Sequence, residues 1–137
     1  MTRASYIQAM TQLGARPPEQ AGILMGPMDS PVVTHFLLDK NGRGSPIHFE
    51  LDDQYLNGEL RKFLALQMEA KGFLHSHPKN CRELSAGDLK YLRRIWNNPN
   101  NDCERIFMPI VVGRKMHPFV VDRDDPDSPK PAKLQLI

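Results

Sequence analysis

The sequence predicts a layered α/β or α+β domain built on a mixed β-sheet. Three observations favour this fold class. Segments with apolar residues at helical spacing alternate along the chain with apolar runs of strand length. Some neighbouring runs are separated only by short turn segments, which join antiparallel strands and therefore exclude a purely parallel sheet. The length of 137 residues corresponds to one domain, because domains commonly have about 100–200 residues.

The first half of the chain predicts one helix, a hairpin of buried strands and a short edge strand. Residues 4–13 carry apolar side chains at helical spacing, and prolines after them break the chain. The runs Gly22–Gly26 and Val32–Leu38 are apolar, have strand length and are separated by prolines and an aspartate. Asn41–Gly44 has the composition of a turn. Residues 46–51 then predict the edge strand.

A long helix, a strand and another helix are expected next. Residues 54–71 place apolar side chains at helical spacing, and Gly72 follows them as a stop signal. Phe73–His77 is too short for a helix and is closed off by a proline, so we expect a strand that runs into a loop. Helical spacing resumes over residues 85–96 and ends in an asparagine-rich segment.

The last part of the chain predicts two strands and a polar tail. Arg105–Val112 and His117–Val121 have strand length and are joined by a tight turn that contains Gly113. The residues that follow are rich in proline and charged side chains and have no apolar period, which favours a flexible end. We therefore expect a domain over residues 1–122 and a flexible tail or linker over residues 123–137.

Composition and charge exclude several classes of function. Lys and Arg number 18 against 16 Asp and Glu, and these charges are interspersed, so the sequence predicts no nucleic-acid partner. No apolar run approaches the roughly 20 residues that cross a bilayer, and no signal peptide is recognisable. We therefore expect a cytoplasmic protein with no membrane partner. In that reducing compartment Cys81 and Cys103 are expected to be free thiols.

Two histidines and one aspartate have the spacing of a metal site. His75 and His77 are two positions apart on a predicted strand, so their side chains share one face. Ser85 and Asp88 are three apart at the start of a predicted helix, where they also share a face. Two imidazole nitrogens and one carboxylate suit zinc with an open position for water, as in catalytic sites. Zinc lowers the pKa of such a water to about 7.

A zinc hydrolase also needs a proton carrier and a group that stabilises the developing oxyanion. Glu19 and Ser85 are the candidates for these two catalytic roles. Each also has an ordinary structural interpretation: Ser85 and Asp88 match a helix capping box, and Glu19 alone would be a solvated carboxylate. The histidine pair could equally be a solvated strand end. The joint pattern favours the site, whereas His35, His48 and His117 are interpreted as structural.

The combined motif resembles that of the JAB1/MPN/Mov34 metalloenzymes, also called JAMM domains. It consists of Glu19, then His75-Ser76-His77-Pro78, then Ser85 and Asp88, at the spacing of that family. The segment from Pro17 to Gly26 is also similar to the strand that carries the glutamate in prokaryotic-type members. The resemblance implies a cytidine-deaminase-like fold, with a mixed β-sheet sandwiched between helices. It further implies that zinc is bound by His75, His77 and Asp88, that Glu19 is the general acid/base, and that Ser85 steadies the tetrahedral intermediate.

The resemblance also implies a substrate class and partners. Members of this family cleave isopeptide or peptide bonds after the C-terminal glycine of ubiquitin or ubiquitin-like proteins, and prokaryotic members are linked to sulfur-carrier proteins and to E1-like and E2-like proteins. The expected activity is therefore that of a zinc metallopeptidase of the deubiquitinase-like isopeptidase type. The alternative is a non-catalytic MPN-type module for protein interaction, which would usually lack a ligand. A non-haem iron oxygenase uses similar ligands, but it would leave Glu19 and Ser85 without a role.

Overall fold

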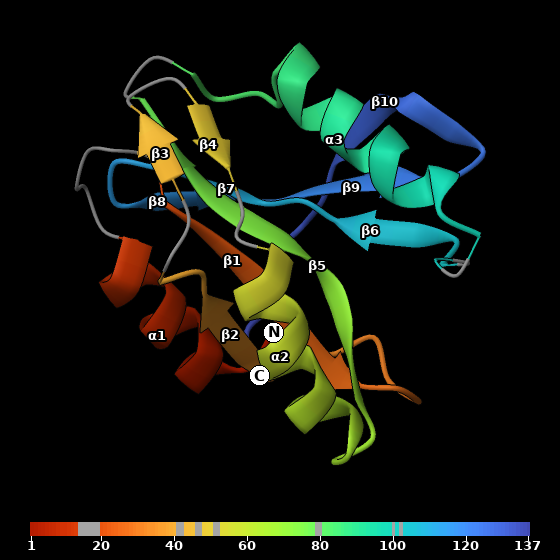
Figure 1. The fold of residues 1–137 in the computed structure, drawn as a ribbon. Coiled ribbons are helices and arrows are strands. Elements are labelled where there is room, and N and C mark those ends of the chain that lie inside the picture. The colour runs from red at the N-terminus through yellow and green to blue at the C-terminus, as the bar shows by residue number, and fades with distance from the viewer. Residues whose placement is uncertain are drawn as a thin grey trace.

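The fold was obtained as a computed structural model and consists of a mixed sheet with helices on both faces (Figure 1). The structure describes residues 1–13, 20–40, 43–45, 48–50, 53–78, 81–99, 101 and 103–137. Helix α1 (Arg3–Leu13) packs on one face of the sheet, and α2 (Asp53–Leu64) and α3 (Ala86–Asn97) pack on the other. This architecture confirms the predicted fold class. None of the helices in the described part of the chain is long and apolar enough to span a bilayer.

Strand β5 (Met68–His77) occupies the middle of the sheet. On one edge it pairs antiparallel with β1 (Ala21–Pro27), which in turn pairs with β2 (His35–Leu38). On its other edge β5 pairs in parallel with two short strands, β6 (Arg105–Phe107) and then β7 (Ile110–Val112). The predicted hairpin is thus confirmed as β1 and β2, and β5 confirms the predicted strand before Pro78. Only β1 is buried along most of its length, because β2 begins at His35 and buries Phe36 alone.

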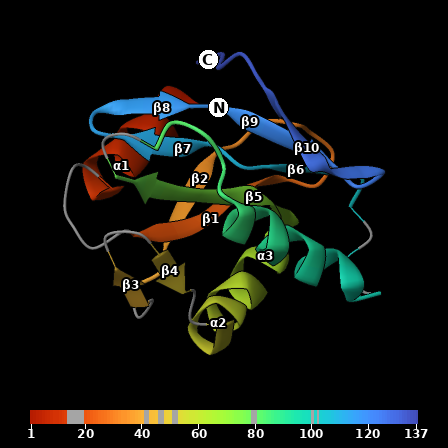
Figure 2. The ribbon, with the colours of Figure 1, turned by 90° about the horizontal axis from the view of Figure 1, so that it is seen from above.

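The sheet continues outward from β6 and β7. Strand β8 (Lys115–His117) pairs with β7, while β9 (Phe119–Asp122) pairs with β6 and β10 (Asp125–Pro131) pairs with β9. The main path of this eight-stranded sheet is therefore β10-β9-β6-β5-β1-β2, and Figure 2 shows β7 and β8 beside it. A separate two-stranded sheet is formed by β3 (Arg43–Ser45) and β4 (His48–Glu50).

Prolines divide each of the last two predicted strands in two. Pro109 lies between β6 and β7, and Pro118 lies between β8 and β9. Proline has no backbone N–H, so it cannot donate to a strand ladder and is found where a ladder is interrupted. The N–H of Met108 donates to the carbonyl of Phe119 over 2.9 Å and links the two interrupted strands. The tight turn between β7 and β8 contains Gly113 with a φ of +62°, which glycine adopts at little cost.

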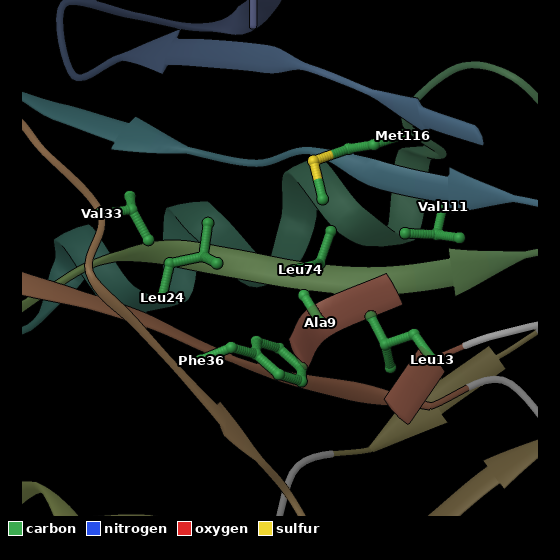
Figure 3. Packing of buried hydrophobic residues seen from close by; sticks show 8 residues of the cluster. All are labelled: Ala9, Leu13, Leu24, Val33, Phe36, Leu74, Val111 and Met116. Atoms are coloured by element: carbon green, nitrogen blue, oxygen red, sulfur yellow. The ribbon is translucent and has the colours of Figure 1, made fainter. Parts of the chain in front are cut away.

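Apolar side chains fill both sides of the sheet because successive residues of a strand point to opposite faces. Leu24 and Leu74 face α1, whereas their neighbours Ile23 and Phe73 face α2 and α3. Figure 3 shows the core on the α1 side. Its buried members are Ala9, Leu13, Leu24, Val33, Phe36, Leu74, Val111 and Met116. The opposite face is covered by α2 over β1 and by α3 over β6 and β9.

The predicted helix over residues 54–71 is correct at its start and wrong at its end. Helix α2 ends at Leu64, the chain turns through Gln67 at a φ of +57°, and β5 begins at Met68. Met68 pairs with Pro27 and packs into the cluster beneath α2. Pairing with β1 thus overrides a local apolar spacing that is compatible with a helix. Of the predicted edge strand over residues 46–51, only residues 48–50 are described. They form β4, which pairs with β3 and not with the main sheet.

The segment after Asp122 also differs from the flexible tail that we predicted. Residues 125–131 form β10, which lies along β9 at the edge of the sheet, where proline is tolerated. Asp127 forms an ion pair with Arg93 of α3 over 2.6 Å. Further on, the N–H of Ile137 donates to the carbonyl of Met1 over 3.1 Å. Backbone pairing and ion pairs therefore fix this segment despite its polar composition.

Gly72 provides a test of the close contact between β5 and β6. A Cβ atom at this position would overlap the backbone carbonyl of Phe107, the residue with which Gly72 is paired. We expect Gly72→Ala to lower the free energy of unfolding by at least about 1–3 kcal/mol, because the two strands would have to move apart. Urea unfolding followed by circular dichroism measures this change.

Gly58 is the matched control for this substitution. It lies within α2, and a Cβ atom there would meet no atom within 4 Å. Gly58→Ala should raise the stability by about 0.5–1 kcal/mol, because alanine favours the helix. Equal effects of the two substitutions would show that the β5–β6 contact does not require glycine.

Candidate metal centre

The two histidines of the motif lie at the end of the central strand. His75 pairs with Ala21 of β1 and with Ile110 of β7, and His77 pairs with Val112. Because the two histidines are two residues apart, both side chains point to the face that carries α3. The side chain of His75 is fully buried and that of His77 is 5% exposed. Their Nε2 atoms lie only 2.6 Å apart, so both imidazoles are directed to one point.

Asp88 reaches the same point from the first turn of α3. Ser85 is the N-cap of this helix: its hydroxyl accepts a hydrogen bond from the Asp88 N–H over 3.1 Å. In return, the Ser85 N–H donates to Oδ2 of Asp88 over 2.8 Å. This capping box confirms the predicted helix start and holds the carboxylate in place. Oδ1 lies 3.2 Å from Nε2 of His75, and Oδ2 lies 3.1 Å from Nε2 of His77.

The donor atoms of these three residues fit a single metal ion. They all lie within 4.8 Å of one another, and the three distances of closest approach are between 2.6 and 3.2 Å. Two atoms that are each about 2.0–2.2 Å from one ion can be up to about 4.4 Å apart, so these separations are compatible with shared coordination. Two nitrogens and one oxygen match zinc, but they fit other first-row metals as well. The structure therefore supports a metal site without identifying the metal.

Burial and hydrogen bonding shift the pKa values of Asp88 and His75. Burial alone would raise the pKa of the Asp88 carboxyl, but hydrogen bonds with His75 and His77 outweigh it and hold that pKa far below its ordinary value. For His75, burial lowers the pKa, and the attraction of Asp88 offsets only part of this effect. An anionic carboxylate beside a neutral imidazole is the ionisation state that metal ligation requires.

The loop after His77 orients its ring. The carbonyl of Cys81 lies 3.0 Å from Nδ1 of His77, which donates to it in the tautomer that leaves the Nε2 lone pair for a metal. The Cys81 N–H in turn donates to the carbonyl of Pro78 over 3.0 Å. Contacts of this kind fix the orientation of metal-binding histidines. The sequence could not reveal this contact, because it uses a backbone carbonyl that any residue at position 81 would supply.

The structure brings four of the five predicted site residues together. His75, His77 and Asp88 form the candidate site, and the exposed Ser85 stands at its rim as the helix cap. Glu19 lies outside the described residues. Its successor in the chain, Gln20, donates through its N–H to Oγ of Ser76 over 3.0 Å and accepts from the Ser76 N–H over 2.9 Å. Ser76 is thereby a further structural residue of the site, which the motif spacing did not identify.

Comparison with solved structures supports this fold. The solution structure of protein DSY2949 from Desulfitobacterium hafniense matches 99% of this chain and 90% of its own at 19% identity, with a TM-score of 0.74. The crystal structure of AF2198, a JAB1/MPN domain protein from Archaeoglobus fulgidus, matches 99% of this chain and 96% of its own at 15% identity, with a TM-score of 0.55. No model of a known protein family matches the chain, and no curated protein does. At these identities the likeness establishes an MPN-like fold.

Zinc addition tests the candidate site directly. We expect the protein, freed of metal by chelation, to bind one equivalent of Zn²⁺ and to unfold at a higher temperature. At a zinc concentration 100 times the Kd, the gain in stability would be about 2.7 kcal/mol. Asp88→Asn should abolish this shift, because it removes the anionic ligand while its amide oxygen can still accept from the Ser85 N–H. Calorimetric titration measures zinc binding, and thermal unfolding measures the gain in stability. In both experiments each protein is compared with its own metal-free form.

His35→Gln is the matched control for Asp88→Asn. His35 is an exposed histidine on β2 that packs against Phe63, and it is paired with Met25 at the far end of β1 from Ala21. Its substitution should leave zinc binding unchanged. Wild-type affinity in Asp88→Asn would contradict the assigned ligand.

Proposed function

We propose that this protein is a zinc-dependent isopeptidase or peptidase that cleaves after the C-terminal glycine of ubiquitin or of a ubiquitin-like protein of the sulfur-carrier type. The observation that carries the proposal is the convergence of His75, His77 and Asp88 on one point. Three protein ligands leave a position for water or substrate, which is typical of catalytic zinc sites. The MPN-like fold shared with the JAB1/MPN domain protein AF2198 supports the same assignment.

Zinc bound here would act as a Lewis acid and lower the pKa of a water molecule to about 7. The protein must then move that water's proton to the leaving amine, and we assign this role to Glu19. A carboxylate within hydrogen-bond reach of the reacting water can serve as base and then as acid. Two hydrogen bonds fix the chain at Gln20 beside Ser76, between the two histidines, which supports a role for the adjoining residue Glu19.

Ser85 is assigned to the developing oxyanion. Its hydroxyl accepts from the Asp88 N–H, so its own proton remains available for a second partner. A hydrogen-bond donor aimed at an oxyanion typically raises the rate by about 10²–10³-fold. This corresponds to a lowering of the activation free energy by about 3–4 kcal/mol. The capping and catalytic interpretations of Ser85 are therefore compatible, since one hydroxyl can serve both.

The partners in this proposal are a ubiquitin-like or sulfur-carrier substrate and E1-like or E2-like proteins that act on the same substrate. The proposed place of action is the cytoplasm. A non-catalytic MPN-type interaction module is the competing function. It differs from the proposal in requiring neither a bound metal nor Glu19.

Glu19→Gln tests the proposed chemistry. Glutamine has nearly the same shape but cannot accept the proton, so cleavage of a Gly-Gly-Lys isopeptide substrate should fall by about 10²–10⁴-fold. Zinc content, measured by atomic absorption, should stay at one ion per chain, because Glu19 is not an assigned ligand.

Glu104→Gln is the control, since Glu104 is exposed and lies next to β6, away from the candidate site. It should retain wild-type activity. Undiminished cleavage by Glu19→Gln would overturn the assigned base. A wild-type protein that binds zinc and cleaves nothing would instead favour the interaction module.

A further inference from the structure

A group of positively charged side chains lies beside the candidate metal centre, and neither the metal site nor the core accounts for it. The sheet register places the first of them. His77 pairs with Val112 of β7, and Val112 pairs with Lys115 of β8. Paired residues on adjacent strands point to the same face. Lys115 therefore shares the face of the metal ligands, two strands from His77, which corresponds to about 10 Å.

Arg82 approaches the same place from the loop. The carbonyl of Cys81 contacts the ring of His77 over 3.0 Å, and Arg82 is the next residue. Its side chain is exposed, as is that of Lys115. The turn that precedes Lys115 also contains the exposed Arg114. Two segments that are distant in the sequence thus deliver positive charge to one side of the candidate site.

Among the described residues, no ion pair joins Arg82, Arg114 or Lys115 to a carboxylate. The exposed Glu83 follows Arg82, and the buried Asp88 is engaged by the two histidines. The half-buried His117 lies in register with Ile110 and His75. Partial burial lowers the pKa of His117, and repulsion from Lys115 and Arg82 lowers it further.

We propose that Arg82 and Lys115 form a subsite for acidic side chains of the substrate. A substrate strand that leaves the metal centre along this face advances about 3.3 Å per residue. The distance of about 10 Å therefore corresponds to about three residues, so the acidic side chains lie about three positions from the bond that is cut. The inference rests on the proposed function for the identity of that bond, but the binding that it predicts does not require cleavage.

Peptide binding tests the subsite separately from catalysis. The probes are two fluorescein-labelled peptides that end in Gly-Gly and carry either two aspartates or two lysines three and four positions before the last glycine. Fluorescence anisotropy with the zinc-loaded protein at low salt should show about tenfold tighter binding of the acidic peptide. This preference should shrink in 0.5 M salt, because exposed charges are screened.

Charge reversal identifies the residues responsible. Arg82→Glu and Lys115→Glu should each weaken binding of the acidic peptide by about 3–10-fold. The double variant should prefer the basic peptide, which a general loss of structure would not produce. Arg61→Glu is the matched control, because Arg61 is exposed on α2 and makes no ion pair with another described residue. It should stay within about twofold of the wild type.

Three outcomes would overturn the subsite: equal affinity for the two peptides, no measurable binding of either, or an effect of Arg61→Glu equal to that of Arg82→Glu. These outcomes are distinct from failure of the proposed function. A protein that prefers the acidic peptide but cleaves no isopeptide retains the subsite and loses the hydrolase. A protein that cleaves without charge preference retains the hydrolase and loses the subsite.

Discussion

Pairing of β5 on both of its edges is the constraint on which the rest of the molecule depends. One edge pairs antiparallel with β1 and the other pairs in parallel with β6 and β7. Within β5, Gly72 and His75 are paired on both edges, and this register decides which face each side chain of the strand occupies. A slip of one residue would turn His75 and His77 toward the α1 core and would send Leu74 to the metal side. The register of the sheet alone therefore directs both imidazoles of the candidate metal site to one face.

The Asp88 carboxylate joins this sheet to the helical layer. Its Oδ2 accepts from the Ser85 N–H at the start of α3, and both oxygens contact histidines of β5. A buried charge is costly unless it is paired, and here every partner is supplied by the site itself. One carboxylate thus caps a helix, holds that helix against the sheet and provides the anionic group of the candidate metal site. The capping box and the candidate metal site therefore share this carboxylate.

The sequence predicted the candidate site better than it predicted the boundaries of the elements. The spacing of two on a strand and three at a helix start is local geometry, and it correctly brought His75, His77 and Asp88 together. The end of α2 was missed because Met68–Lys71 is compatible with a helix until β1 is available as a partner. Strand β10 was missed because its stability comes from β9 and from Arg93, not from apolar residues of its own. Long-range pairing of this kind leaves little signal in local sequence patterns.

The contacts between the two ends of this chain have a consequence for the order of folding. The Met1 amino group and the N–H groups of Arg3 and Ile137 join residues 1–3 to residues 135–137, and the labels N and C lie side by side in Figures 1 and 2. Bringing residues 1–3 and 135–137 together closes a loop that contains almost the whole chain. This closure costs conformational entropy unless the elements between them are already compact. During synthesis the first residues leave the ribosome long before their partners do. The β1–β2 hairpin can form early, whereas the hydrogen bonds that hold the start of α1 to the C-terminal segment must be among the last to form.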